Sequence, residues 1–295
     1  SIELPSSVTT IAPFAFAYRS ELKSIKLPSS LTMIGAYAFI GCSELTSIEL
    51  PGTVTSIGDG VFKSCSNLTT IDLPSSVTTI GYEAFSCCTG LTSIEIPTSV
   101  TTIGERTFWG CTGLTSIEIP TSVTTISENV FSWSGLTSIE LHSSVTAIGA
   151  GAFAWCYNLA SIGLPSSITT IGESAFSACT GLTSIELPNS VTTIGSYAFD
   201  GCTNLTSVIY NGGAYGEFIF RGCPVSDLTF GGTIVPEHIT YFLGIRESLK
   251  RLALTDRVTT IGENAFWGCN GLTSIELPSS VTTIRDSAFS GCFGL

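Results

Sequence analysis

The chain has 295 residues, of which 43% are hydrophobic and 12% charged, and its formal net charge at pH 7 is −12. Nucleic acids and acidic membrane surfaces both require a basic protein surface, so this charge argues against either as a partner. No apolar run approaches the roughly 20 residues of a membrane-spanning helix, and we predict no membrane insertion in this segment.

A 23-residue segment, Ile94 to Ser116, recurs along nearly the whole chain. Such a period predicts a solenoid, because one unit is too small to bury its apolar face and must stack on its neighbours. About thirteen coils are expected, starting at Ile2, Ile25, Ile48, Ile71, Ile94, Ile117, Ile139, Ile162, Ile185, Val208, Leu228, Leu252 and Ile275. The chain starts without Met and within a repeat, so we expect it to be part of a longer array.

The repeats divide the chain into three stretches of one domain, because a repeat array grows without needing a second core. Residues 1–207 are regular, residues 208–251 have drifted in length and content, and residues 252–295 are regular with a truncated last repeat. We therefore predict a single domain over residues 1–295.

The first half of each coil predicts two extended segments. Ile94 and Ile96 alternate with Glu95, and this period of two indicates a short strand with both isoleucines inward and the carboxylate outward. Pro97 ends the strand because it has no N–H to donate. The β-branched residues from 100 to 103 are suited to a second, half-exposed extended segment.

The second half of each coil predicts a compact, buried turn. Between Glu173 and Cys179, the residues Ala175, Phe176 and Cys179 have helical spacing, which indicates one turn of α- or 3₁₀-helix. Phenylalanine recurs at this position in twelve coils, and we expect these rings to form a buried spine rather than a ligand-binding ladder. They are Phe16, Phe39, Phe62, Phe85, Phe108, Phe131, Phe153, Phe176, Phe199, Phe220, Phe266 and Phe289.

Cysteine also recurs at one repeat position, which predicts a ladder of small buried thiols. A metal site is disfavoured because the clustered Cys/His spacing of such sites is absent. The ladder contains Cys42, Cys65, Cys88, Cys111, Cys156, Cys179, Cys202, Cys269 and Cys292. Only Cys87 and Cys223 are expected outside it.

The strand, Pro, Val-Thr-Thr-Ile, Phe and Cys elements, seen at Ile185 to Gly195 and Ala198 to Leu205, resemble the BspA-type or Treponema pallidum-type leucine-rich repeats. The resemblance covers nearly everything except Val208 to Arg251. It implies a right-handed leucine-rich-repeat solenoid with a parallel β-sheet on the concave face, and short extended segments and single helical turns elsewhere. It also implies an extracellular or cell-surface location, because family members are surface-associated or secreted proteins described as adhesins for host matrix proteins or other bacteria.

Five carboxylates occupy the outward strand position of consecutive coils: Glu49, Asp72, Glu95, Glu118 and Glu140. Neighbouring parallel strands lie about 4.8 Å apart, so unscreened neighbours in such a column repel by about 0.9 kcal/mol in water. The column is a candidate surface for a basic patch on a partner protein. A divalent cation such as calcium is a less favoured alternative, and a solvated stripe copied by repeat duplication would need no ligand at all.

The irregular stretch supplies further candidate partner contacts, Tyr241, Arg246 and Arg251. Aromatic residues and arginine commonly anchor protein interfaces. The alternative is that these coils keep their apolar residues buried and merely bend or break the solenoid.

No enzyme and no cofactor are predicted. Catalysis needs unlike groups converging in one pocket, whereas repeats place like groups in lines, and neither His142 nor His238 has an evident partner in the sequence. We expect a surface or secreted protein-binding scaffold that adheres to host matrix proteins or other cells through its concave face. The alternatives are a structural spacer of a larger surface protein and, less favoured, a carbohydrate-binding array.

Overall fold

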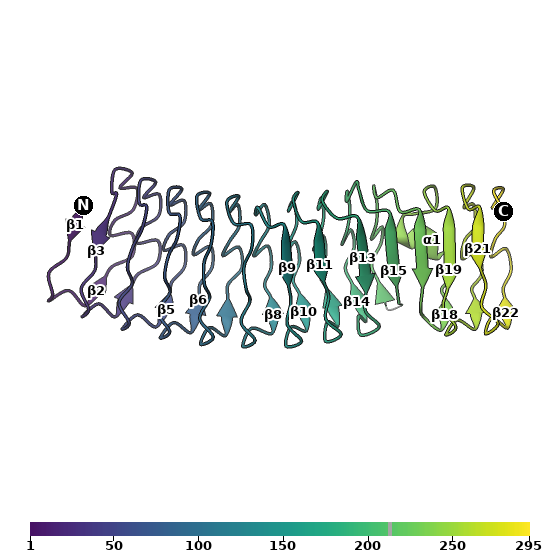
Figure 1. The fold of residues 1–295 in the computed structure, drawn as a ribbon, viewed down its shortest axis with the longest axis horizontal. Helices are drawn as coiled ribbons and strands as arrows, with labels where there is room; N and C mark the ends of the chain where they lie inside the picture. Colours follow the sequence, from purple (N-terminus) through teal and green to yellow (C-terminus); the bar gives the residue numbers. More distant parts are fainter. Residues whose placement is uncertain (212–213) are drawn as a thin grey trace.

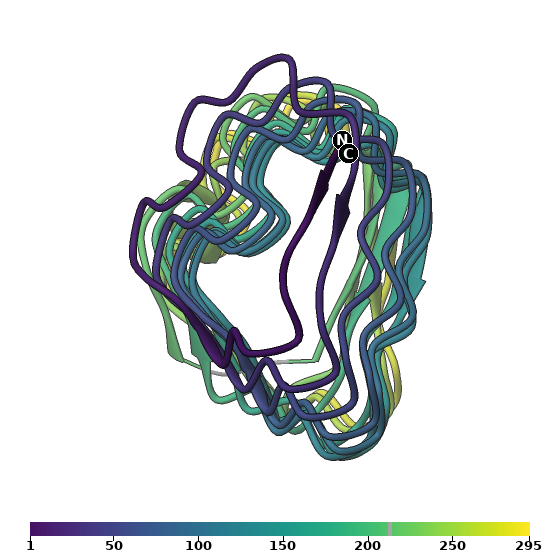
Figure 2. The same ribbon diagram turned by 90° about the vertical axis from the view of Figure 1, so that its left-hand side faces the viewer.

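The computed structural model describes residues 1–211 and 214–295. Its coils stack side by side along one long axis, with the two ends of the chain at opposite ends of the stack (Figure 1). Consecutive coils pair in parallel at the predicted 23-residue offset, as Ile2 does with Ile25 and Thr170 with Thr193. The view along the axis shows the first coils displaced from the later ones, so the stack turns gradually along its length (Figure 2). The predicted solenoid is confirmed.

The strands that begin the coils form a parallel ladder, which pairs in three successive groups in the described part of the chain, and we call its outward surface the strand face. Its strands are β1 (Ile2–Glu3), β3 (Ile25–Lys26), β9 (Ser138–Glu140), β11 (Ser161–Gly163), β13 (Ser184–Leu187), β15 (Ser207–Tyr210), β17 (Asp227–Phe230), β19 (Arg251–Leu254) and β21 (Ser274–Glu276). Where the strands are shorter, single parallel bridges join Glu49 to Asp72 and Asp72 to Glu95. The inward isoleucines of this ladder are largely buried, as the alternation predicted.

The second extended segments of the coils form another parallel ladder, whose strands pair in four successive groups in the described part of the chain. Its strands are β2 (Thr10–Ile11), β4 (Met33–Ile34), β5 (Ser56–Ile57), β6 (Thr79–Ile80), β7 (Thr102–Ile103), β8 (Thr125–Ile126), β10 (Ala147–Ile148), β12 (Thr170–Ile171), β14 (Thr193–Ile194), β16 (Ala214–Tyr215), β18 (Ile234–Val235), β20 (Thr260–Ile261) and β22 (Thr283–Ile284). In β7 the isoleucine is buried and the threonine exposed. Just before this ladder, Ser99 Oγ donates to the carbonyl of Val77 one coil away (2.6 Å), so side chains also tie the coils together.

The third side of each coil is a run of turns, which we call the turn ladder, and the helical turn predicted between Glu173 and Cys179 is wrong. The backbone N–H groups alternate between two kinds of partner. Ser177 and Cys179 donate three residues back within the coil, to Ser174 and Phe176. Phe176 and Ala178 instead donate to carbonyls of the next coil, both at 2.7 Å. These bonds between coils take the N–H groups that a helix would use internally.

Two residues per coil in the turn ladder have left-handed backbone conformations, four residues apart in the regular coils. In one coil they are Ser174 (φ 53°) and Ala178 (φ 58°). In the next coil Gly201 (φ 72°) stands where Ala178 stands, which explains the recurrent glycine before the cysteine. Residues with a Cβ are strained in this conformation, by roughly 1–2 kcal/mol.

The phenylalanine spine is confirmed. Adjacent rings are stacked, with centroids from 4.9 Å (Phe176 and Phe199) to 5.7 Å apart (Phe39 and Phe62). The first and last members, Phe16 and Phe289, are partly buried. The spine is interrupted after Phe220 by the short helix α1 (Ile239–Leu243), whose buried Ile239 and Leu243 join the core there.

The cysteine ladder is confirmed with one correction. The ladder thiols donate to the carbonyl of a phenylalanine one coil back, as Cys179 Sγ does to Phe153 (3.0 Å). Cys269 is the exception, because α1 precedes it in place of a spine phenylalanine and its hydrogen-bond partner is Thr240. Cys223, which we expected outside the ladder, makes the equivalent bond to Phe199 (3.0 Å) and is buried. The coil around Cys223 is shorter than the regular coils. Cys223 still lies three residues after Phe220, as Cys179 does after Phe176, so its thiol stays in register with the ladder. All eleven cysteines are free thiols.

Burial makes the ladder thiols hard to ionise, and it raises the pKa of Cys156 and of Cys269 to about 11 each. Because the thiolate is the reactive form, we expect a thiol reagent at pH 8 to label only Cys87 and, more slowly, Cys292 in the folded protein. All eleven should react after denaturation. Cys87→Ser should abolish the fast phase, and rapid labelling of more than two thiols in the native protein would contradict the buried ladder.

Candidate partner-binding surfaces

The five column carboxylates lie where the alternation predicted, exposed on the strand face of five consecutive coils. Glu95 is typical, since it stands between Ile94 and Ile96, which are both inward and only 7% exposed. Neighbouring strand residues in a ladder point to opposite faces, so anchoring the isoleucines fixes the carboxylate outward. The column is therefore a property of the fold and needs no special loop to display it.

The strand face has ion pairs near both of its ends. Lys26 Nζ lies 2.7 Å from Glu3, and Arg251 lies 3.5 Å from Asp227 and 4.0 Å from Glu276. Within residues 1–211 and 214–295, none of the column carboxylates forms an ion pair. The strand face thus carries unpaired negative charge in its middle and paired charge at its ends.

The geometry gives little support to calcium as the ligand of the column. No group of three or more His, Cys, Asp or Glu residues in the described part of the chain is arranged to hold a metal ion. Calcium takes six to eight oxygen ligands, and a single file supplies one carboxylate per coil.

The candidates of the irregular stretch do not form one site. Arg251 stands on the strand face in β19, whereas Tyr241 and Arg246 lie in and just after α1. The latter two line a pocket of about 360 Å³, which we call the α1 pocket. Its lining residues are His238, Thr240, Tyr241, Arg246, Asn264 and Trp267.

The irregular stretch does not break the solenoid. Strand β17 pairs in register with β15 on one side and β19 on the other, and Leu228 lies opposite Val208 and Leu252. Tyr210 and Phe230 are buried, in line with the expectation that these coils keep apolar residues inside. The coil length changes in two places: the two strands of each irregular coil lie closer in sequence, as in β15 and β16, and α1 lengthens the turn ladder between β18 and β19.

Sequence reasoning did not single out an exposed aromatic cluster in the turn ladder. The rings of Trp133 and Trp155 are stacked with centroids 5.1 Å apart, and Tyr157 packs edge-on against Trp133. Both tryptophans have left-handed backbones, at the position where Gly110 and Gly201 stand in other coils. Tryptophan in a glycine position of the repeat was the signal available in the sequence.

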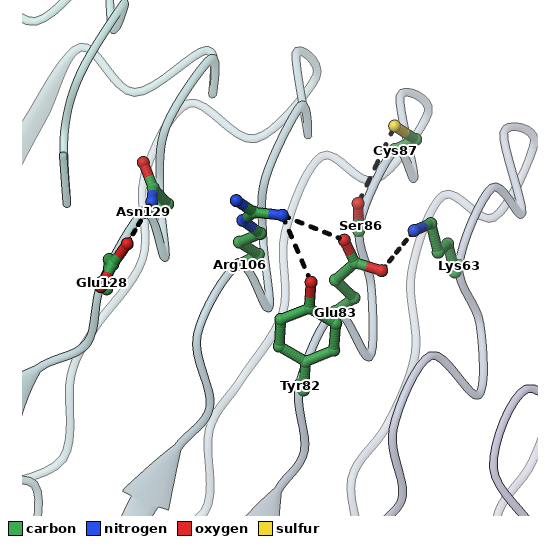
Figure 3. A network of polar contacts seen from close by, with 8 residues as sticks. All are labelled: Lys63, Tyr82, Glu83, Ser86, Cys87, Arg106, Glu128 and Asn129. Carbon is green, nitrogen blue, oxygen red and sulfur yellow. Dashed lines mark hydrogen bonds and ion pairs between the residues drawn. The ribbon is translucent and has the colours of Figure 1, made fainter.

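A charged network in the turn ladder was also missed (Figure 3). Glu83 is a buried carboxylate in a left-handed conformation, and it accepts a hydrogen bond from Lys63 of the preceding coil. Arg106 of the following coil lies 3.9 Å away from Glu83 and donates to the hydroxyl of Tyr82 (3.3 Å). The network joins three coils and leaves the buried charge paired.

Short parallel strands stacked at a fixed period, hydroxyl bonds between coils such as that of Ser99, and one continuous apolar interior define a leucine-rich-repeat solenoid. The sequence matches the BspA type Leucine rich repeat region over residues 1–115, 103–226 and 237–295. The chain belongs to this family. The matched family is a repeat scaffold, and it indicates no catalytic activity.

Solved structures of bacterial repeat proteins are similar along the whole chain. A leucine-rich repeat protein from Bacteroides ovatus is 32% identical with a TM-score of 0.80, and the match covers 100% of this chain and 85% of that one. A leucine rich cell surface protein from Faecalibacterium prausnitzii is 33% identical with a TM-score of 0.60, over 100% and 86% of the two chains. No curated protein matches the sequence significantly. Among the described residues, no helix has the length and apolar character needed to cross a bilayer.

Proposed function

We propose that the chain is the binding scaffold of a cell-surface or secreted protein and that it adheres to host matrix proteins or other cells through the strand face. The observation that carries this proposal is the unpaired carboxylate column. A basic patch on a partner protein would meet five carboxylates in line, each exposed and, among the residues that the structure describes, outside any ion pair. Complementary charge of this kind speeds encounter and sets the register of an interface.

Three further findings support the proposal. The family is built of repeats that offer extended surfaces, and a similar structure is described as a cell surface protein. Like charges directly across neighbouring strands are unfavourable, so the column costs stability unless a ligand or solvent offsets the repulsion. The strand face also pairs its acidic residues with cations at Lys26 and Arg251, which shows that pairing is available to this fold.

The test neutralises the middle of the column with the triple variant Asp72→Asn, Glu95→Gln and Glu118→Gln. Binding to a panel of immobilised extracellular-matrix proteins, and to polylysine as a simple basic probe, is measured at low and high salt. If each lost pair contributes about 0.5 kcal/mol, the triple variant should bind about tenfold more weakly than the parent. The parent should also lose affinity as salt rises, because exposed charges are screened.

The matched control removes three equally exposed carboxylates from the other side of the coils, Glu105→Gln, Glu128→Gln and Glu173→Gln. Both triples change the net charge by the same amount, so only a specific role for the column separates them. If both triple variants lose the same affinity, net charge rather than the column explains the binding. If the parent binds no matrix protein, the chain is better explained as a structural spacer. Salt-independent binding of neutral sugars would favour the carbohydrate-binding array.

A further inference from the structure

The α1 pocket combines features that the carboxylate column lacks. It is hollowed into the turn ladder, between the irregular coil that contains α1 and the regular coil that contains Trp267. Tyr241 and Trp267 are about half exposed, at 54% and 48%, so their rings are available to a ligand. The volume of about 360 Å³ falls at the lower end of the range of about 300–1,000 Å³ that is typical of small-molecule sites.

Arg246 provides a positive charge in this pocket without a carboxylate partner. Its guanidinium lies over the Trp267 ring, 5.3 Å from the ring centroid. It forms no ion pair among the residues that the structure describes, in a chain whose net charge is −12. The side chain is half buried, so it is held at the pocket rather than dispersed in solvent.

The following coil fixes the position of Arg246. Gly268 has a left-handed backbone (φ 71°), and a Cβ built there would lie 3.4 Å from Cδ of Arg246 and 4.0 Å from its Nη1. The arginine therefore lies along the following coil, beside the Trp267 ring and the Gly268 backbone. This contact restricts the guanidinium, which reduces the entropy that a ligand has to offset.

The acidic residues around the pocket form no ion pair with Arg246 in the part of the chain that the structure describes. Glu263 accepts a hydrogen bond from Asn264 (3.3 Å), and Glu237 lies 3.7 Å from Arg285. Glu247, next to Arg246 in the chain, is exposed and forms no ion pair in the part that the structure describes. The guanidinium thus remains available to an anion from outside.

We propose that the α1 pocket binds the carboxylate-bearing sugar ring of an acidic glycan. Arg246 is suited to hold the carboxylate, because its fork of N–H donors matches the two oxygens. The apolar C–H face of the ring would stack on Tyr241, which is exposed and whose aromatic face carries partial negative charge, because the Arg246 guanidinium already lies over the Trp267 ring. His238 and Asn264 supply hydrogen-bonding groups for the ring hydroxyls.

A sugar ring fits these features better than an acidic peptide does. The cavity is small and two aromatic side chains line it, whereas an extended peptide would need a groove with free backbone partners. A doubly charged phosphate would call for more than the single arginine present. The proposal is independent of the strand face, because the pocket lies in the turn ladder.

The test uses the full chain and four probes: glucuronic acid, N-acetylneuraminic acid, neutral glucose and a short glutamate-containing peptide. Binding is followed by tryptophan fluorescence and by saturation-transfer NMR, which reports the protons that touch the protein. Both acidic sugars should bind in the millimolar range, and glucose and the peptide should bind about tenfold more weakly or not at all. Arg246→Gln should weaken acidic-sugar binding about tenfold or more.

Arg257→Gln is the matched control, because Arg257 is exposed, lies outside the pocket and carries the same charge. It should leave sugar binding unchanged, as should the column triple, so failure of this proposal is distinguishable from failure of the strand-face proposal. Tyr241→Ala, at an exposed side chain, serves as a second variant if Arg246→Gln does not fold. The proposal is overturned if neither acidic sugar binds, if glucose or the peptide binds equally well, or if folded Arg246→Gln or Tyr241→Ala binds like the parent.

Discussion

Phe108→Ala is expected to lower the free energy of unfolding by about 3–5 kcal/mol, the largest effect of any single substitution considered for this chain. Phe108 is fully buried, and its ring is stacked between those of Phe85 and Phe131 at 5.7 Å on each side. The coil of Phe108 is tied to the preceding coil by the β6–β7 pair and the bridge from Asp72 to Glu95. It is tied to the following coil by turn-ladder bonds such as Phe108 N–H to the Val130 carbonyl (2.9 Å), and these contacts restrain the backbone from collapsing into the cavity. The loss should therefore approach the upper end of this range.

Phe289→Ala is the matched control for this prediction. Phe289 has the same repeat position, but it is partly buried and stacks on one neighbour only, Phe266 at 5.3 Å. Its truncation should cost clearly less, and urea denaturation of both variants beside the parent measures the difference. Equal losses at the two positions would mean that stacking within the spine does not determine the stability of a coil.

The spine and the strand ladder could be predicted because each coil contacts its two neighbours. In such an array, the period of the sequence is also the period of the structure. Ile94, Glu95 and Ile96 show this most simply, since alternation alone placed two side chains inside and one outside. The residue pattern of one coil therefore predicted which side chains are buried in most of the other coils.

The turn ladder could not be predicted from one coil. The spacing of Ala175, Phe176 and Cys179 is compatible both with a helical turn and with the run of turns that forms. Hydrogen bonds to the next coil decide between the two, such as the bond from Phe176 N to the carbonyl of Ala198 (2.7 Å). These partners lie in the next coil, and the spacing of apolar residues within one coil does not reveal them. The recurrent glycine represented by Gly201 was the available sign of a left-handed position.

One candidate surface could be predicted from the sequence and the other could not. The carboxylate column follows from strand alternation, so its exposure was predictable although its ligand was not. The α1 pocket required the position of Trp267 relative to Arg246, which depends on how an irregular coil packs on a regular one. Arg251 is only five residues beyond Arg246 yet belongs to the strand face, because the chain crosses from one side of the coil to the other between them.

Lys63→Met is expected to lower the free energy of unfolding by about 2 kcal/mol, because it removes the closest partner of the buried Glu83 carboxylate. The loss should stay below the roughly 3–5 kcal/mol of a fully buried broken pair. Arg106 remains 3.9 Å from Glu83, and the Lys63 side chain is itself 29% exposed. Thermal or urea denaturation of the variant measures the loss.

The double variant Lys63→Met/Glu83→Met tests the cause of that loss. Replacing both partners by apolar side chains of similar length leaves no unpaired carboxylate, so most of the lost stability should return. The left-handed backbone at residue 83 is kept in both variants, since methionine is no better suited to it than glutamate. If the double variant is as unstable as Lys63→Met, the loss arises from packing of the lysine chain rather than from the charge of Glu83.

The pH dependence of the same pair separates charge from packing in a second way. Burial lowers the pKa of Lys63, but the hydrogen bond and the negative charge of Glu83 outweigh burial, and the pKa is raised above its usual value of 10.5. A raised lysine pKa in the folded state stabilises the protein fully below the unfolded-state pKa, and this contribution is lost as pH rises through the folded-state pKa. The stability difference between the parent and Lys63→Met should therefore be constant near neutral pH and shrink above about pH 10.5. A difference that persists unchanged at higher pH would assign the effect to the lysine methylenes, because deprotonation removes the charge and leaves them in place.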